Sequence, residues 1–485
     1  MKIIGINYLS ESSVCLLDRG KIISSVSEER INRKKNWYGL PEKSIKYILN
    51  KNNLEINDID YFVTSGISAI DKSVPDNKIY LNKINEIKTS KLNFYRKKRQ
   101  IAFLKQRFKH EKKVIHIRTK NLLDRLKFKY KKLKVYDHHL SHAASAYFNS
   151  GFKDCFAITI DGWGDNSSSK IFHFKNGIYN EISSTPTIDS LGYFYGSITK
   201  LLGFKPHQHE GKILGLAAYG NQNKIISEIS EMIKYDSSKK IFKGCYEKGY
   251  YQSTFDNKNL SVLLKKYSTK DIAASTQLIL EKTITKCIKD LSKDKINLAL
   301  AGGVFANVKL NQKIKELKNV KDIYIFPNMG DGGLCVGGAQ LLYHEKTKKK
   351  PKKIKNMYLG HNFSNLEISK ELKKYQLSFI KLNQIEKKIA ELLSQKKVIA
   401  HFNNKMEFGP RALGNRSILC SASDKSINNW LNKKLKRTEF MPFAPIILKR
   451  KIKDYMYVNN LNDYMFMTMT CKCKKIMTKK APAAV

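Results

Sequence analysis

The sequence predicts an α/β protein whose N-terminal part carries one strand–turn–strand pattern twice. Residues 1–30 read KIIGINYL, SESS and VCLLDRGKIISSVSEER, and Cys155–Phe174 repeats the pattern with an Asp-Gly loop and a Ser run between two apolar strands. Two later apolar strands, Ile296–Leu300 and the segment IYIFP, each lead into a glycine-rich turn and a helix. Strands that end in Gly-, Ser- or Asp-rich turns and alternate with helices are typical of α/β folds.

The turns between these strands also suggest phosphate binding. Hairpin tips that carry Ser, Asp and Gly present backbone N–H groups, which commonly hold phosphate. Two such hairpins followed by a strand–Gly-Gly–helix unit resemble the duplicated actin/sugar-kinase/heat-shock-ATPase fold.

Changes in composition along the chain predict two domains. Residues 1–345 form the large α/β domain, interrupted by a Lys-rich insertion or lid at about 83–134. The charge run EKTKKKPKKIKN has no apolar periodicity, so 346–356 is predicted to be a basic linker. In 357–485 the patterns predict amphipathic helices at Leu366–Tyr375 and Ile385–Leu393, a buried strand VIAHF and a polar loop KMEFGPRALGNRSIL.

Composition limits the class of protein. The chain has 485 residues, 42% of them hydrophobic, which is enough to bury sizeable cores. It has no apolar run of the roughly 20 residues that span a bilayer. The N-terminus has no signal-peptide apolar region, and eight scattered cysteines argue against a disulfide framework. We therefore expect a cytoplasmic protein without a membrane span.

The formal charge of +48 allows two interpretations. A strongly basic chain suits a polyanion partner such as a nucleic acid. However, the excess is mostly Lys and is spread over several separate runs, whereas proteins that read bases tend to rely on Arg. We favour a solvated basic surface and do not expect a nucleic-acid partner.

The sharpest local motif is Asp137-His138-His139-Leu140-Ser141-His142. On a helix, His138 and His142 share one face at a spacing that allows both to bind one metal, and His139 points elsewhere. Either Asp161 or Asp331, each at a strand end, suits a third ligand. Clustered histidines that line an ordinary polar core are the alternative.

Two further groups of residues have a spacing that suits nucleotide or phosphate. Gly302 and Gly303 at a strand-to-helix turn let the backbone approach a nucleotide, and Asn307 and Asn311 follow on the next helix. Arg411 and Arg416 lie in the Gly/Pro-containing loop MEFGPRALGNRS and suit phosphate or carboxylate. The structural alternatives are tight turns and helix packing for the glycines, and an internal ion pair for the arginines.

Taken in order, the segments HHLSHAASA, IDGWGD, EGKILGLAAYG, AGGVFANVKLN, MGDGG, MEFGPRALGNRSIL and PFAP resemble the O-carbamoyltransferases of the nodulation and cephalosporin/aminoglycoside type. The resemblance runs along the whole chain except the Lys-rich insertion. It implies an N-terminal domain similar to the tRNA threonylcarbamoyl-transferase fold, followed by a YrdC-like domain. It also implies that carbamoyl phosphate and ATP form carbamoyl-adenylate, from which the carbamoyl group passes to a hydroxyl of a sugar or secondary metabolite.

The same resemblance implies roles for individual residues. The metal site, of the Fe²⁺ type or another divalent ion, falls on four residues: His138, His142, Asp161 and Asp331. Asn307 and Asn311 are expected to contact the adenylate, and Lys35 the acceptor. In the second domain, Arg411 is expected to grip the nucleotide (ATP with Mg²⁺) or carbamoyl phosphate, with Arg437 near PFAP as a second candidate.

The chain departs from the family pattern in three places. Ser10 stands in the first turn where the family has a His, and Asn404-Lys405 and Met441 replace a Gly-Arg pair and an Arg. The sequence also ends at KKAPAAV, roughly 80–100 residues before a typical member ends. We therefore expect a C-terminally incomplete YrdC-like domain that activates carbamoyl phosphate poorly. The alternative functions are a relative of the tRNA threonylcarbamoyl-transferases and a catalytically impaired ATP-binding protein. The sequence indicates no particular oligomeric state.

Overall fold

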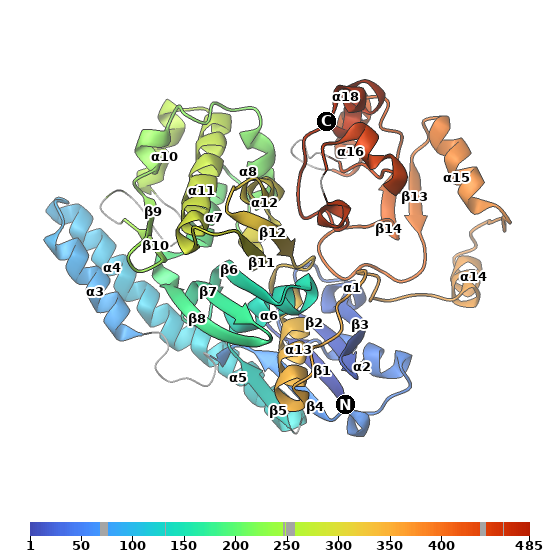
Figure 1. Cartoon of the computed structure of the whole chain (residues 1–485), viewed down its shortest axis with the longest axis horizontal. Helices are drawn as coiled ribbons and strands as arrows, with labels where there is room; N and C mark the ends of the chain where they lie inside the picture. The colour runs from blue at the N-terminus through green and yellow to red at the C-terminus, as the bar shows by residue number, and fades with distance from the viewer. Residues whose placement is uncertain (68–75, 131, 246–247, 249–257, 437–442, 459) are drawn as a thin grey trace. The chain divides into compact units, whose positions relative to one another are not determined.

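The computed structural model describes residues 1–485 except 68–75, 131, 246–247, 249–257, 437–442 and 459 (Figure 1). Within the described residues the chain forms two compact units, Met1–Ile354 and Lys355–Val485. The boundary between these units falls inside the predicted basic linker at 346–356. No helix in the described ranges combines the length and the apolar character needed to cross a lipid bilayer.

The first half of unit 1 is built on a five-stranded sheet of order β3-β2-β1-β4-β5. Its strands are β1 (Lys2–Asn7), β2 (Ser13–Asp18), β3 (Lys21–Ser27), β4 (Tyr61–Ser65) and β5 (Leu133–Tyr136). β1, β2 and β3 form an antiparallel meander, and β4 and β5 continue the sheet in parallel with β1. Alternate apolar side chains of β1 pack into a core with α2 (Glu42–Lys51) and with Leu123 and Leu126.

The second half of unit 1 repeats this topology in a sheet of order β12-β11-β6-β7-β8. Its strands are β6 (Asp154–Gly164), β7 (Ser167–Lys175), β8 (Ile178–Pro186), β11 (Ile296–Ala301) and β12 (Val320–Ile325). β6, β7 and β8 form the antiparallel meander, and β11 and β12 are parallel to β6. Strand order and direction are thus repeated, which confirms the predicted duplicated actin/sugar-kinase/heat-shock-ATPase-like fold.

The structure corrects the predicted positions of the turns. The segment expected to be one second strand is two strands, because the chain turns at Arg19 and Gly20, whose φ angles are 47° and 77°. In the second sheet, Asp161 and Gly162 lie inside β6 and the Ser run lies inside β7. The turn between them is displaced to Asp165, which has a φ of 56°. Asp161 therefore belongs to strand β6 and not to a loop, at a register shift between the paired residues Ile160 and Gly164.

Two helices pack closely between the sheets: α6 (His138–Ser150) and α13 (Leu334–Thr347). A Cβ on Gly337 of α13 would lie 1.8 Å from the carbonyl oxygen of Ser141 on α6. This position of the glycine-rich segment serves helix packing, which was the structural alternative for the glycines. The packing brings α6 close to the residues that precede α13.

The Lys-rich insertion is helical and connects β4 with β5. It contains α3 (Asn77–Thr89), α4 (Phe94–His110) and α5 (His116–Lys129), with a π-helical turn at Glu111–Ile115 between α4 and α5. Figure 1 shows α3 beside α4 at one side of the unit. The buried Lys83 pairs with Asp189 at 3.0 Å, so α3 is tied to the second half of unit 1.

The remaining elements of unit 1 surround these sheets. They are α1 (Glu28–Asn32), α7 (Leu191–Leu201), α8 (Glu210–Ala217), α9 (Ile226–Ile229), the hairpin β9 (Ile233–Asp236) and β10 (Ile241–Gly244), α10 (Lys258–Lys266), α11 (Thr269–Leu291) and α12 (Val308–Lys315).

Unit 2 has a small antiparallel pair of strands and several helices. Its elements are α14 (Asn365–Lys374), α15 (Ile385–Ser394), β13 (Ile399–Phe402), β14 (Arg416–Leu419), α16 (Ser426–Lys434), α17 (Ile452–Tyr455) and α18 (Lys475–Lys480). The two helices predicted here form within one residue of the expected bounds. The predicted buried strand VIAHF forms β13, but its side chains are half-buried or exposed, because β14 is its only described partner strand. The end of the predicted polar loop, RSIL, is β14 itself. The YrdC-like character of this unit stays a prediction.

Candidate metal centre

Two histidines face the same side at the start of α6. The side chain of Asp137 caps the helix and accepts the N–H of Leu140 at 2.8 Å, so helical geometry begins at His138. The backbone N–H of His138 is further held by Asp165 at 2.7 Å. Both imidazoles are buried, and the ring centroids of His138 and His142 are 4.7 Å apart.

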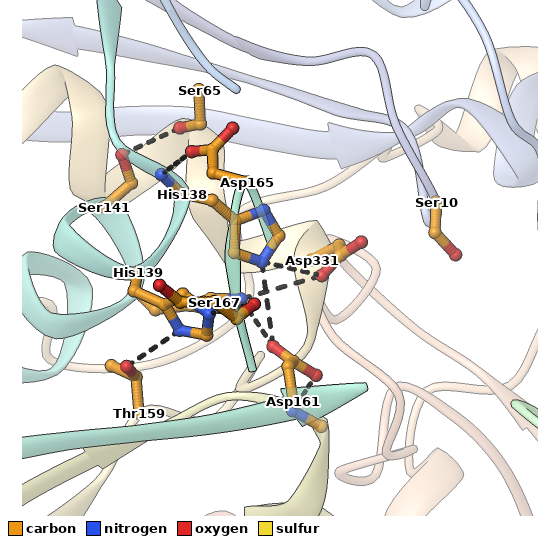
Figure 2. Close-up of polar contacts among 12 residues, drawn as sticks. Ser10, Ser65, His138, His139, Ser141, Thr159, Asp161, Asp165, Ser167 and Asp331 are labelled. Carbon is orange, nitrogen blue, oxygen red and sulfur yellow. Dashed lines mark hydrogen bonds and ion pairs between the residues drawn. The ribbon is translucent and has the colours of Figure 1, made fainter. Parts of the chain in front are cut away.

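Two carboxylates complete the cluster, Asp161 from β6 and Asp331 from the turn between β12 and α13. The Nε2 atom of His142 lies 3.0 Å from Asp161 Oδ2 and 3.6 Å from Asp331 Oδ1. His138 Nε2 lies 3.7 Å and 3.6 Å from the same two oxygens. Figure 2 shows His138, Asp161 and Asp331 pointing toward one another. Four side chains predicted from distant parts of the sequence thus lie together.

The donor atoms of this cluster fit a divalent metal ion. One ligand atom from each residue lies within 4.8 Å of all the others. Atoms that share an ion at about 2.0–2.2 Å are separated by about 3–3.6 Å. In the described structure, all four imidazole nitrogens and Asp161 Oδ2 are buried without a hydrogen bond. Such atoms are costly to bury unless a ligand satisfies them, and two His with carboxylates suit Fe²⁺ and other first-row divalent ions.

The electrostatics of the cluster favour positive charge. Burial lowers the pKa of His142, but the adjacent carboxylates of Asp161 and Asp331 outweigh it and raise that pKa to about 9. The pKa of His138 is raised by the same two carboxylates against the effect of burial. Burial raises the pKa of Asp161, yet the two imidazoles hold it well below its ordinary value. A metal cation entering the site therefore displaces protons from the imidazoles.

The predicted glycines lie next to Asp161. The N–H of Gly303 donates to Asp161 Oδ1 at 2.7 Å, which leaves Oδ2 directed toward the histidines. Gly302 has a φ of +99°, and a Cβ there would lie 2.4 Å from the carbonyl oxygen of Ile160. Gly303 therefore orients the Asp161 carboxylate, and Gly302 packs against the backbone of the preceding residue, Ile160.

His139 is directed away from the cluster, in line with its position on the helix. Its Nδ1 is 2.9 Å from the hydroxyl of Thr159 and its Nε2 is 3.1 Å from the carbonyl oxygen of Ser167. Burial, together with the nearby His138, lowers the pKa of His139 to about 3. The ring is neutral and structural.

Glu11 is a site residue that the sequence analysis missed. Its Oε2 accepts the N–H of Gly332 at 3.2 Å, so it holds the turn that carries Asp331. Burial and the charge of Asp331 raise the pKa of Glu11 to about 7. The only local signal is its place in the first hairpin turn, beside Ser10. Figure 2 shows Ser10 to one side of the cluster without a drawn contact to it.

The two asparagines expected to contact the adenylate have bonds within the protein. Asn307 caps α12 by accepting the N–H of Leu310 at 3.0 Å, and its Nδ2 donates to Gln277 at 2.8 Å. Asn311 is fully buried and its Nδ2 donates to the carbonyl oxygen of Phe305 at 2.7 Å. Nucleotide contact by either amide stays a prediction.

The arginines of unit 2 differ in their surroundings. The Arg416 guanidinium donates to the carbonyl oxygens of Asn403, Asn404 and Asn415 at 2.5–3.0 Å, and it stacks on Phe402. The Arg416 side chain therefore stabilises the conformation of the loop, a role that the spacing of residues in the sequence does not reveal. Arg411 is half-buried, and this burial lowers its pKa.

The loop that carries Arg411 is organised by Glu407, which the sequence analysis also missed. Glu407 is 6% exposed, and its Oε1 accepts the backbone N–H groups of Leu413, Asn415 and Arg416 at 2.8–3.2 Å. Lys35 is exposed on the loop after α1. Arg437 lies outside the described residues.

Comparisons with known proteins add to this geometry. The family model described as carbamoyltransferase N-terminus matches residues 2–340, and that described as carbamoyltransferase C-terminus matches residues 390–485. The uncharacterized protein MJ1051 of Methanocaldococcus jannaschii is 34% identical over 100% of this chain and 85% of its own length. Nodulation protein NolNO of Sinorhizobium fredii is 27% identical over 95% of this chain and 66% of its own length.

Among solved structures, HypF of T. kodakarensis is similar to this chain with a TM-score of 0.38 and 13% identity. The similarity covers 71% of this chain and 48% of that chain.

Proposed function

The chain belongs to the carbamoyltransferase family, and we propose that it is an O-carbamoyltransferase that works in two steps. In the first step, water hydrolyses carbamoyl phosphate to carbamate and phosphate. A carbamate oxygen then attacks the α-phosphorus of ATP, which is bound with Mg²⁺, so that carbamoyl-adenylate forms and pyrophosphate leaves. In the second, a hydroxyl oxygen of a saccharide or other small acceptor attacks the carbamoyl carbon. The hydroxyl proton leaves, and AMP departs with the electrons of the broken acyl–phosphate bond.

The observation that carries the second step is the buried His–Asp cluster of unit 1. Its imidazole nitrogens and Asp161 Oδ2 lack hydrogen bonds in the described structure, although they lie 3.0–3.7 Å from oppositely charged groups. His138, His142, Asp161 and Asp331 would hold a divalent ion, which when bound polarises a carbonyl as a Lewis acid. Asp161 and Asp331 have side chains 13% and 19% exposed, so the carboxylate side is the open side of the site.

The protein's own residues keep this arrangement rigid. Gly303 fixes the direction of the Asp161 carboxylate, and Glu11 fixes the turn before α13. The cap at Asp137 fixes the first turn of α6, from which both histidines extend. Such preorganisation places reacting groups without reorganisation during the reaction.

We assign the first step to unit 2, where Arg411 is the candidate residue for binding the anionic substrates ATP and carbamoyl phosphate. An arginine whose charge is disfavoured by burial gains most from a bound phosphate. Glu407 and Arg416 stabilise the surrounding loop through hydrogen bonds to its backbone, and so position Arg411.

The test is to measure divalent metal content and AMP formation from ATP and carbamoyl phosphate, with and without acceptor. The variant is H138A/H142A, and the matched control is H173A. His173 lies on β7 and pairs with Asp154 at 2.8 Å, away from the cluster. We expect the double variant to lose its metal and carbamoyl transfer, and H173A to keep both.

Two outcomes would contradict the proposal. Equal metal content in the double variant and the control would exclude the cluster as the metal site. AMP formation that does not depend on carbamoyl phosphate would exclude carbamoyl-adenylate as the intermediate.

A further inference from the structure

A groove lies between the loop after α1 and the Lys-rich insertion. Its volume is about 460 Å³, with Tyr38 and Gly39 on one side and Lys113, Arg118 and Arg125 on the other. This size falls within the range of about 300–1,000 Å³ that is usual for small-molecule sites. It suits a ligand the size of a sugar phosphate.

The charge of the groove is one-sided. Three of its described lining residues are cationic and none is acidic. The Arg118 guanidinium lies 4.1 Å from the centre of the Tyr38 ring. A guanidinium stacked in this way keeps the N–H groups at its edge available for a carboxylate or phosphate. Arg125 has an acidic neighbour, Glu42, at 3.8 Å, outside the lining residues.

The loop side of the groove is connected to the metal centre by hydrogen bonds. The N–H of Ser12 donates to the carbonyl oxygen of Trp37 at 3.1 Å, so the residue before Tyr38 is fixed to the first hairpin turn. Glu11 in that turn accepts the N–H of Gly332, which follows Asp331. The loop that carries Tyr38 is thus linked through the first hairpin turn to the turn that carries Asp331.

The insertion helix is anchored at the other side of the metal centre. Arg107 pairs with Glu111 at 2.7 Å, and its guanidinium lies 5.7 Å from the centre of the Tyr193 ring. That ring packs on Gly162, because a Cβ there would lie 3.3 Å from its edge, and Gly162 follows Asp161. The segment from 107 to 118 thus connects the Tyr193 ring, which packs beside Asp161, with the Tyr38 ring of the groove. It contains the π-helical turn, a distortion frequently found at functional sites.

We propose that this groove binds the acceptor of the carbamoyl group and that the acceptor is anionic, a sugar-sized hydroxyl compound carrying a phosphate or a carboxylate. That this ligand is the carbamoyl acceptor rests on the proposed function. Its binding to the groove can be measured without ATP or carbamoyl phosphate. Arg118 and Arg125 recognise the anion, and the loop at Tyr38 and Gly39 faces the rest of the ligand.

The test is calorimetric titration of the full chain with three probes: glucose 1-phosphate, glucuronate and glucose. The variant R118Q/R125Q removes two cations of the groove. The control K120Q/K127Q removes two exposed cations of the same helix that do not line it. We expect an anionic probe to bind at least about tenfold more tightly than glucose, and the groove variant to lose that difference. The control keeps it, and all three proteins share one melting temperature.

The possible results decide the proposal. Tighter binding of glucose 1-phosphate assigns a phosphate group, and tighter binding of glucuronate a carboxylate. No binding of either anion, binding of glucose with equal affinity, or an equal loss in the control overturns the proposal. The metal and AMP measurements above do not depend on these residues, so failure of the proposed function would appear there separately.

Discussion

The His–Asp cluster of unit 1 and the arginine loop of unit 2 look equally suited to a ligand in the sequence, and they differ in how their polar atoms are satisfied. In the cluster, buried imidazole nitrogens face carboxylates at 3.0–3.7 Å without hydrogen bonds in the described structure. In the loop, Glu407 Oε1 and the two terminal nitrogens of the Arg416 guanidinium form hydrogen bonds with the surrounding backbone.

This difference separates residues that shape a site from residues that await a ligand. A polar group whose hydrogen bonds are made within the protein stabilises a conformation, whereas one buried without partners costs free energy until a ligand arrives. The predictions below test that distinction, starting with the largest effect.

The largest effect is expected from a substitution that touches no ligand atom. G337A places a methyl group 1.8 Å from the carbonyl oxygen of Ser141, so α6 and α13 must separate. We expect a loss of about 3 kcal/mol or more in stability, with loss of bound metal. G211A is the matched control, since no atom lies within 4 Å of the added Cβ and Ala favours the helix by up to about 1 kcal/mol. Calorimetric melting and metal analysis check both variants, and a normal melting temperature for G337A would contradict the close packing.

The second prediction removes one negative charge from the His–Asp cluster. D161N keeps Oδ1 as the acceptor for Gly303 but removes the negative charge at the metal position. We expect metal affinity to fall on the order of a hundredfold or more, with the fold retained. D154N, at the exposed start of the same strand, serves as the control in a metal titration. Unchanged affinity in D161N would remove Asp161 from the ligand set.

In the arginine loop, a substitution of Glu407 should change the conformational stability of the loop. E407Q still offers an oxygen to the N–H groups of Leu413, Asn415 and Arg416, but these bonds lose their charge assistance. We expect a cost of about 1–2 kcal/mol, seen as about tenfold faster hydrogen exchange of those amides. Exchange that stays at the wild-type rate would show that Glu407 does not organise the loop.

The smallest effect separates capping from nucleotide binding at Asn307. N307A removes the cap of α12 and should cost about 1 kcal/mol. N307S restores a capping oxygen but not the amide. If the residue only caps the helix, N307S regains both melting temperature and ATP affinity. If the amide contacts the nucleotide, it regains only the melting temperature.

Sequence reasoning succeeded where the signal was periodic or local. The spacing of His138 and His142 predicts a shared helix face, and the repeated hairpin pattern predicts the duplicated sheet. It failed where a role depends on partners far along the chain. Glu11 has no motif of its own, and it becomes a site residue only because Gly332 lies against it.

The arginine loop also shows what sequence reasoning misses, because two residues that look alike in the sequence have different surroundings in the structure. Sequence cannot distinguish Arg411 from Arg416, since both stand in one Gly/Pro-containing motif. Folding places backbone carbonyls around Arg416 and leaves Arg411 half-buried. The run at Asp161 and Gly162 reads as a loop because Asp and Gly favour turns, yet it lies within β6, at a register shift between the paired residues Ile160 and Gly164.

The sequence by itself predicted the α/β class and the duplicated architecture, because periodicity and turn chemistry are local properties of the chain. The order of its motifs predicted the family, and the family resemblance in turn implied the four residues that lie together in the cluster. Only the tertiary structure decided which polar groups are left without partners. Hydrogen bonds such as those of Gly303 to Asp161 and Gly332 to Glu11 join residues 142 and 321 positions apart. A group's need for a ligand depends on the bonds that folding leaves unmade, and no local pattern records them.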